Sequence, residues 1–434
     1  MVGEPKYSEL DKLSGEIARC GRCGFCQSVC PVYQVTAHEE GVARGRNMFA
    51  KELIEGHVAI SVKNEGFFKE CLLCRACVEI CFSAVKTDEI VLAGRRASNR
   101  IRGVSSLHRY VLNYLLTDHG RLGRAIRLAS FGRTAGAVRL AQALDIFGWY
   151  GGKFRRADEF LGQMPRRFLR ERLKKRRRSA IGTTAKATLR EAFFFIGCGT
   201  NFMFPEVGES TINFLQKIGY EVTILANSCC GLPAHAHGAA DTVERLAEAN
   251  IRLLSESEGP IVTDCSSCAS FMKRYPEILS AGGAGGSLIE RAQAMSGRVR
   301  DVTEILSASS LAPTMEPAGE ALRVTFHDPC HLSRHQKLSQ AAREALRLLP
   351  GIEFIEMKEA DWCCGGAGAF SVEYPDLSLQ ILERKVRNIE ESGARIVATT
   401  CPACMMQLQS GLRQSGAAAR RLVQVKHLVE LARD

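Results

Sequence analysis

The sequence predicts a multidomain α+β protein: an N-terminal α-helical unit, a basic helical linker, and a pair of duplicated α/β domains with short parallel sheets. Three observations support this prediction. The length of 434 residues corresponds to about three domains. Eight cysteines gather near the N-terminus, and ten further cysteines form two similar sets. The composition, 46% hydrophobic and 24% charged, is that of a folded globular protein. We expect domains at 1–94, 95–190, 191–310 and 311–434.

The first eight cysteines follow the pattern C-x2-C-x2-C-x3-C twice. They are Cys20, Cys23, Cys26 and Cys30, then Cys71, Cys74, Cys77 and Cys81. Pro31 follows the first motif, whereas Phe82 takes the proline's place after the second, where we expect it to pack beneath a cluster. Between the motifs, the apolar spacing of residues 43–56 and the closing glycine predict a helix.

This spacing is typical of two-cluster bacterial ferredoxins, in which the fourth cysteine of each motif ligates the other cluster. We therefore assign one 4Fe–4S cluster to Cys20, Cys23, Cys26 and Cys81, and the second to Cys71, Cys74, Cys77 and Cys30. A pair of four-cysteine zinc sites is the alternative. The N-terminus lacks a basic start followed by an apolar run, which argues against a signal peptide. We expect a reducing, cytoplasmic location, where cysteines serve metal or redox chemistry.

Residues 95–190 are strongly basic. They contain 24 lysines and arginines against 5 acidic residues, so this segment carries +19 while the rest of the chain carries −8. An amphipathic basic surface would contact an anionic membrane or an acidic partner, and a solvated helical linker is the simpler interpretation. We expect no nucleic acid partner, since no recognisable module accompanies the charge. The longest apolar stretch, 140–152, is too short for a membrane span.

The other ten cysteines form an internal repeat with offsets of 132 to 136 residues. The first set is Cys198, Cys229, Cys230, Cys265 and Cys268, and the second is Cys330, Cys363, Cys364, Cys401 and Cys404. Three short β-type runs alternate with helical segments in each copy, at 193–196, 222–225 and 261–263 in the first and at 324–326, 352–355 and 396–398 in the second. Each cysteine group follows such a run. Ligands of parallel sheets gather beyond the carboxyl ends of the strands, so five thiolates should converge in each copy.

Five thiolates exceed the needs of one tetrahedral ion. A non-standard iron–sulfur cluster, a zinc site with a spare cysteine, and a reactive dithiol remain open interpretations. The histidines beside these cysteines are expected to hydrogen-bond sulfur rather than to bind metal. They are His235, His237, His327 and His331. Arg334 and Lys337 would add positive charge, and Trp362 would shield a cluster from water.

The motifs resemble the iron–sulfur subunit of glycolate oxidase and of related bacterial lactate oxidoreductases. The resemblance runs from about Cys20 to His427 and is most specific at Cys23-Gly24-Phe25-Cys26, His327-Asp328-Pro329-Cys330-His331-Leu332 and Cys363-Cys364-Gly365-Gly366-Ala367-Gly368. The same pair of CCG domains resembles the catalytic subunit of heterodisulfide reductase. That resemblance implies one or two non-cubane 4Fe–4S clusters, each held by one set of five cysteines. Some glycolate oxidase subunits lack one cysteine of each CxxC, whereas both are present here.

No glycine-rich loop follows a strand and opens a helix as a dinucleotide site requires, so we expect no FAD or NAD in this chain. Hydride chemistry on a hydroxy acid needs such a cofactor. The resemblance therefore implies an electron-transfer subunit without catalytic residues of its own. It would take electrons from an FAD-binding partner subunit and pass them to a quinone or another respiratory acceptor. A disulfide reductase and a zinc-stabilised scaffold are the alternatives.

Overall fold

The fold is that of a computed structural model. The structure describes residues 7–134, 164–179, 190–255, 258–309, 321–417 and 423–432. Parts of the predicted basic linker, 135–163 and 180–189, lie outside these ranges. Helices dominate the described chain and two small parallel sheets lie in its C-terminal half, which confirms the predicted fold class. The exact domain boundaries remain a prediction.

The N-terminal unit is helical, as predicted from the segment between its cysteine motifs. Its helices are α1 (Ser8–Asp11), α2 (Ser14–Ala18), α3 (Phe25–Val29), α4 (Pro31–Thr36), η1 (Glu39–Gly41), α5 (Ala43–Ile54), α6 (Gly66–Lys69), α7 (Ala76–Glu79) and α8 (Thr87–Arg102). Helix α5 buries Ala43, Asn47, Ala50 and Leu53 on one face, at the three- and four-residue spacing of an amphipathic helix. This face closes the core beside both cysteine motifs.

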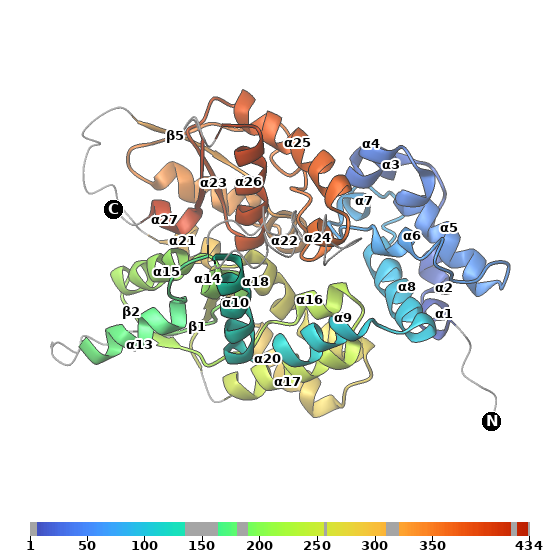
Figure 1. The fold of residues 1–434 in the computed structure, drawn as a ribbon, viewed down its shortest axis with the longest axis horizontal. Coiled ribbons are helices and arrows are strands. Elements are labelled where there is room, and N and C mark those ends of the chain that lie inside the picture. Colours follow the sequence, from blue (N-terminus) through green and yellow to red (C-terminus); the bar gives the residue numbers. More distant parts are fainter. Residues whose placement is uncertain are drawn as a thin grey trace.

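The described part of the linker is also helical. It contains α9 (Ser106–Tyr110), the π-helical turn η2 (Val111–Leu115), α10 (His119–Thr134) and α13 (Leu169–Ser179). The side chain of Ser105 caps α9 by accepting a hydrogen bond from the His108 amide. These helices cover the first CCG unit (Figure 1).

Each CCG unit contains a four-stranded parallel sheet with helices between its strands. The first unit consists of β1 (Arg190–Phe194), α14 (Cys198–Phe202), α15 (Pro205–Lys217), β2 (Tyr220–Ile224), α16 (Leu232–Ala236), α17 (Ala240–Leu254), β3 (Ile261–Thr263), α18 (Ser266–Lys273), α19 (Tyr275–Ala281), α20 (Gly286–Ser296), β4 (Val299–Asp301) and α21 (Val302–Ala308). The second consists of β5 (Leu322–Phe326), α22 (Cys330–Gln336), α23 (Ser339–Leu348), β6 (Ile352–Phe354), α24 (Phe370–Glu373), α25 (Pro375–Glu391), β7 (Ile396–Thr399), α26 (Pro402–Gln414), β8 (Gln424–His427) and α27 (Leu428–Leu431).

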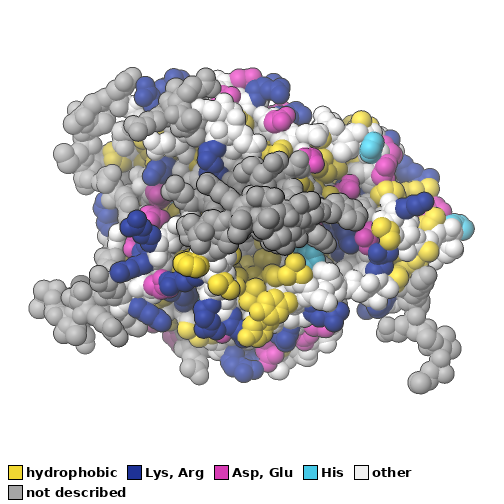
Figure 2. All heavy atoms as spheres, in the orientation of Figure 1, with side chains coloured by type: hydrophobic (Ala, Val, Ile, Leu, Met, Phe, Trp, Pro, Cys, Tyr) yellow, Lys and Arg dark blue, Asp and Glu magenta, His cyan; other side chains and the backbone are white. Residues whose placement is uncertain are grey.

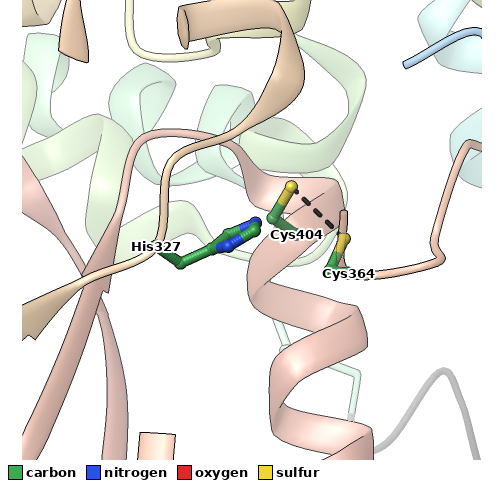
Figure 3. A group of neighbouring side chains, drawn as sticks. All are labelled: His327, Cys364 and Cys404. Carbon is green, nitrogen blue, oxygen red and sulfur yellow. Dashed lines mark hydrogen bonds between the residues drawn. The ribbon is translucent and has the colours of Figure 1, made fainter. Parts of the chain in front are cut away.

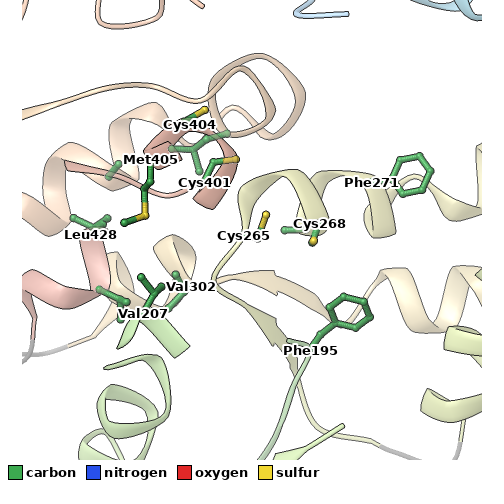
Figure 4. Packing of buried hydrophobic residues seen from close by; sticks show 14 of the residues in the cluster. Phe195, Val207, Cys265, Cys268, Phe271, Val302, Cys401, Cys404, Met405 and Leu428 are labelled. Carbon is green, nitrogen blue, oxygen red and sulfur yellow. The ribbon is translucent and has the colours of Figure 1, made fainter. Parts of the chain in front are cut away.

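The two sheets have the same topology. Their strand orders are β2-β1-β3-β4 and β6-β5-β7-β8, with every pair parallel. One buried apolar cluster runs through both units and includes Val207, Val302, Met405 and Leu428 (Figure 4). The copies are therefore joined through a common hydrophobic core.

The N-terminal unit lies against both CCG units (Figure 1). Arg95 of α8 donates hydrogen bonds to the carbonyls of Cys71, in its own unit, and Ala236, in the first CCG unit, each at 2.5 Å. Asn99 donates to the His237 carbonyl at 2.6 Å. Toward the second unit, Lys337 pairs with Glu79. These polar contacts fix the cysteine motifs relative to the CCG cysteines.

Candidate metal centres

The two N-terminal motifs fold as matching loops. Arg22 and Leu73, each directly before the second cysteine of its motif, both adopt a positive φ of 54°. In each motif the first two cysteines precede the helix, and the third lies in its first turn, Cys26 in α3 and Cys77 in α7. Cys30 then caps α4 ahead of Pro31, and Cys81 follows α7. The two loops thus hold their cysteines at equivalent positions.

The fourth cysteine of the first motif lies close to the cysteines of the second motif. Burial first, and then the neighbouring Cys71, Cys74 and Cys30, raise the pKa of the Cys77 thiol. Cys30 of the first motif therefore lies with three cysteines of the second, which is the neighbourhood that the crossed assignment requires. Cys26 has both Cys20 and Cys30 as neighbours, and Cys20 packs in the same apolar cluster as Cys71 and Cys81. The ligand assignment itself remains a prediction.

The side chain of Arg46 lies close to Cys30, Cys71 and Cys77 and bears on whether these cysteines fit an anionic cluster. Its guanidinium is buried, and its Nη2 has no hydrogen-bond partner among the described residues. Burial opposes the charged form, but the nearby Cys71, Cys30 and Cys77 raise the net pKa of Arg46. A buried cation with an unpaired donor is costly unless negative charge faces it. A cluster held by four thiolates carries that charge, so these residues fit a 4Fe–4S group.

In the CCG units, every cysteine follows the carboxyl end of a strand or opens the next helix, as predicted. Cys198 and Cys330 begin α14 and α22, and Cys265 and Cys401 are the N-caps of α18 and α26. The adjacent cysteines occupy the loops after β2 and β6. The glycine of each CCG motif has a positive φ, 97° at Gly231 and 81° at Gly365, and its amide donates to the sulfur of the first cysteine of the pair.

The ten CCG cysteines line one cavity of about 790 Å³, together with Cys71 of the N-terminal unit. Within the second set, the sulfur atoms of Cys364 and Cys404 are 3.6 Å apart. Between the sets, the Cys401 thiol faces Cys265, and this contact is the leading reason why the pKa of Cys401 is lowered. Figure 4 shows Cys265 and Cys268 of α18 facing Cys401 and Cys404 of α26. The two predicted sites are thus neighbours across the repeat.

The donor chemistry of this cavity fits metal. In both sets, contact between buried thiols lowers the pKa of one cysteine and raises that of another: Cys229 is lowered beside Cys198, and Cys363 is lowered beside Cys330. Buried thiolates need compensating positive charge, and soft sulfur donors select iron–sulfur clusters or zinc. The number and type of the groups remain a prediction.

The second N-terminal motif adjoins the second CCG site. Burial first and then Cys363 raise the pKa of Cys74 to about 12. The Arg334 guanidinium lies near Cys74, Cys330 and Cys363, and donates to the Asp361 carboxylate at 2.7 Å. Trp362 packs in the same apolar cluster as Cys74 and Cys363, and whether it shields a metal cluster or is ordinary core stays a prediction. The predicted positive charge is therefore present at Arg334.

Two residues of the linker reach the first CCG site, and sequence reasoning missed both. His119 Nε2 lies 3.6 Å from Cys198 Sγ. Arg170 donates to His119 Nδ1 at 3.3 Å and to the Leu225 carbonyl at 2.6 Å. Burial, followed by Arg170, lowers the pKa of His119 to about 4. Only the tertiary fold brings these residues to a cysteine far along the chain, so no local pattern could have found them.

Of the other residues that the sequence analysis placed near the metal centres, some lie beside cysteine sulfur and others do not. His331 Nδ1 lies 3.1 Å from Ser267 Oγ and 3.7 Å from Cys330 Sγ, close to the predicted sulfur. His235 instead packs against Phe271, and His237 faces Glu373. Lys337 is exposed and pairs with Glu79, which lies between Cys77 and Cys81 of the second motif. Phe82 is 82% exposed and packs edge-on against Phe25, so its packing beneath a cluster stays a prediction.

The basic linker presents apolar side chains at the surface. Leu107, Tyr110, Leu128 and Phe131 are exposed, and Figure 2 shows apolar and basic side chains side by side over α9 and α10. In the described ranges, we find no helix with the length and hydropathy needed to cross a bilayer.

Comparison with known proteins identifies the same domains. The model of the 4Fe-4S dicluster domain matches residues 16–85, and that of the cysteine-rich CCG domain matches 192–273 and 324–409. The probable glycolate oxidase iron-sulfur subunit of Bacillus subtilis is 27% identical over 430 residues, covering 96% of this chain and 93% of that protein. The glycolate oxidase iron-sulfur subunit of Escherichia coli is 24% identical, covering 95% and 92%.

A third relative indicates the breadth of the group. One subunit of the fumarate reductase (CoM/CoB) of Methanothermobacter marburgensis is 26% identical over 433 residues, covering 98% of this chain and 73% of that protein. All these matches extend over both cysteine-rich halves. The chain belongs to the family of iron–sulfur proteins in which a 4Fe-4S dicluster domain precedes two CCG domains, the family that includes the glycolate oxidase iron-sulfur subunits.

Proposed function

We propose that this chain is the electron-transfer subunit of a flavin-linked 2-hydroxyacid oxidoreductase, with glycolate or lactate as the substrate of the complex. An FAD-binding partner subunit would oxidise the hydroxy acid, and a quinone or another respiratory acceptor would receive the electrons. The observation that supports this most is the close succession of cysteine groups from the surface inward. Cys23 is exposed, whereas Cys74 is buried beside Cys363.

The ligands of this proposal are the eighteen cysteines. Cys20, Cys23, Cys26 and Cys81 would hold one 4Fe–4S cluster, and Cys71, Cys74, Cys77 and Cys30 the other. Each set of five CCG cysteines would hold a non-cubane 4Fe–4S cluster. Such clusters, when bound, accept and release single electrons. The protein supplies burial, hydrogen bonds from backbone amides to sulfur, and the cations Arg46 and Arg334.

The test uses the whole chain, purified anaerobically with and without a coexpressed FAD-linked partner. Iron and acid-labile sulfide analysis should give about sixteen iron atoms if all four sites are filled. Glycolate or lactate should reduce the clusters only when the partner is present, as followed by paramagnetic resonance. Material without iron and sulfide, or clusters that no hydroxy acid reduces through any such partner, would contradict the proposal.

A disulfide reductase is the second candidate, favoured by the shared cavity lined by all ten CCG cysteines. Its wall also includes His108, whose Nε2 lies 3.1 Å from a Glu373 oxygen, and His237. A disulfide takes up two electrons and two protons to give two thiols, and these side chains could deliver the protons. Dye-driven reduction of a disulfide that disappears in Cys364→Ser and Cys404→Ser would favour this candidate. Its absence in the fully loaded protein would exclude it.

A further inference from the structure

His327 marks a chemical difference between two otherwise equivalent sites. It lies 132 residues after Phe195, the same offset that separates Cys330 from Cys198. The amides of Phe195 and His327 make the same hydrogen bond to the neighbouring strand, to Val262 and Ala398 respectively, each at 2.9 Å. The two positions thus have equivalent backbone contacts, but the second carries an imidazole where the first carries a phenyl ring.

The His327 imidazole is buried and aimed at sulfur. It is 1% exposed, and neither ring nitrogen has a hydrogen-bond partner among the described residues. A ring nitrogen and the sulfur atoms of Cys364 and Cys404 all lie within 4.8 Å of one another. Figure 3 shows the ring pointing toward both sulfur atoms. A buried imidazole without a partner is costly unless something binds it.

The nearest alternative partner is already occupied. The Ala360 carbonyl near the ring accepts hydrogen bonds from the Asp328 amide at 2.9 Å and from Lys385 Nζ at 3.1 Å. An imidazole nitrogen that takes part in no hydrogen bond has a lone pair that can bind metal.

We propose that His327 binds a metal ion of the second CCG site together with Cys364 and Cys404. Two thiolates on one tetrahedral ion, with metal–sulfur bonds of about 2.3 Å, lie about 3.7 Å apart, close to the 3.6 Å separation of these two sulfur atoms. Phe195 offers no such donor at the aligned position of the first site. The imidazole near Cys198 there, His119, differs from His327 because its Nδ1 accepts a hydrogen bond from Arg170. The inference rests on the proposal that the second CCG site holds metal.

This ligand gives the two sites different reduction potentials. With five cysteines in each set, His327 adds an imidazole to the ligands of the second site, whereas the aligned Phe195 adds none to the first. Ligand identity is one of the factors that set the potential of an iron–sulfur centre, so the two potentials should be unequal.

The decisive measurement is pulsed paramagnetic resonance on the anaerobic full-length protein, prepared with ¹⁴N- or ¹⁵N-histidine. A strong nitrogen coupling that changes with the isotope is expected in the wild type and should be lost in His327→Phe, which installs the residue of the first repeat. His235→Phe is the matched control. His235 is half-buried and its Nε2 is a buried nitrogen without a hydrogen-bond partner among the described residues, but the ring packs against Phe271, so this variant should leave the coupling intact.

Each result supports or overturns the inference. If His327→Phe does not fold, the isotope dependence in the wild type still decides. A CCG cluster signal without strong histidine coupling would overturn ligation by His327 while leaving the relay proposal standing. If analysis finds zinc in place of iron at this site, the cluster proposal fails there. X-ray absorption at the zinc edge then decides the inference, through the presence or absence of an imidazole shell removed by His327→Phe.

Discussion

At the residue scale, Arg46 should set the potential of the centre near Cys30, Cys71 and Cys77. A charge at roughly 6 Å acting through an effective dielectric constant of about 20 contributes about 3 kcal/mol, on the order of 100 mV for one electron. We therefore expect Arg46→Met to lower the midpoint potential of this centre by several tens of mV or more. A potentiometric titration followed by paramagnetic resonance measures the shift.

Arg96→Met is the control for this prediction. Arg96 is also largely buried, but its charged neighbours are Glu9 and Glu89 rather than cysteines. An unchanged potential in Arg46→Met with full iron content, or an equal shift in Arg96→Met, would contradict the role of Arg46.

The carboxyl group of Glu359 should make the free energy of unfolding depend on pH. The Arg384 hydrogen bonds, opposed by partial burial and assisted by Asn388, lower the pKa of Glu359 to about 2 from an ordinary 4.5. Stability from a depressed carboxyl pKa is present above pH 4.5 and is lost as the pH falls toward 2. Glu359→Gln should thus lower the unfolding free energy by about 1–2 kcal/mol at pH 7, with the difference from wild type shrinking below about pH 5.

Urea unfolding of the anaerobic proteins between pH 7 and pH 4 measures this difference. Glu353→Gln is the matched control, since the carboxylate of Glu353 is exposed and lies 3.8 Å from the Arg323 guanidinium. Its effect should be near zero at every pH. A Glu359→Gln effect that does not vary with pH would show that the carboxylate is not the source of the stabilisation.

The sequence predicts those site residues whose role follows from their spacing along the chain. The cysteine motifs, and the placement of CCG cysteines at strand ends, follow from residues a few positions apart. Arg46, His119 and Arg170 carry no such local signature, because each reaches its cysteine only through tertiary packing. His327 was expected to hydrogen-bond sulfur, and its lack of a hydrogen-bond partner among the described residues became visible only in the folded chain.

At the element scale, the packing of α8 on the loop after α16 should depend on Gly238. Gly238 has a φ of 72°, and a Cβ there would lie 3.0 Å from the Arg96 amide nitrogen. Gly238→Ala should loosen the N-terminal unit from the first CCG unit, so that amides of α8 exchange hydrogen faster. Gly56→Ala is the control, because Gly56 has a φ of 78° with nothing within 4 Å.

Hydrogen exchange with mass spectrometry distinguishes the two variants. Backbone strain of about 1 kcal/mol is common to both, whereas only Gly238→Ala introduces the close contact. Equal exchange of α8 in the two variants would mean that strain, rather than the contact, controls this packing.

Three strands of each sheet were predicted and the fourth was missed. The predicted runs 261–263 and 352–355 match β3 and β6 within one residue. The missed strands, β4 (Val299–Asp301) and β8 (Gln424–His427), are short, and most of their residues are polar or charged. At an edge of the sheet a strand is covered on fewer sides, so its sequence need not be a continuous apolar run.

At the scale of the whole molecule, the surface over α9 and α10 should bind anionic membranes. Exposed Leu107 and Leu128 lie among the arginines of a segment whose net charge is +19. The full chain should sediment with vesicles that contain anionic phospholipid, and less so at high salt. The double variant Leu107→Ser/Leu128→Ser should bind at least about tenfold more weakly, since two leucines no longer enter the interface.

Leu253→Ser/Leu348→Ser is the matched control, because both leucines are exposed on the CCG units. Equal binding by the two double variants would assign the attraction to charge alone. No binding by the wild type at low salt would rule out this surface as a membrane contact.

The close approach of Cys265 and Cys401 has a consequence for how the protein must mature. Before metal arrives, thiols this near one another are open to oxidation, and Cys401 is the more reactive because its pKa is lowered. A disulfide formed at this point would tie the two halves together and remove a ligand from each. Newly made chains must therefore be loaded before they meet oxygen, and aerobic preparations should accumulate a cross-linked, empty form that a reductant can rescue.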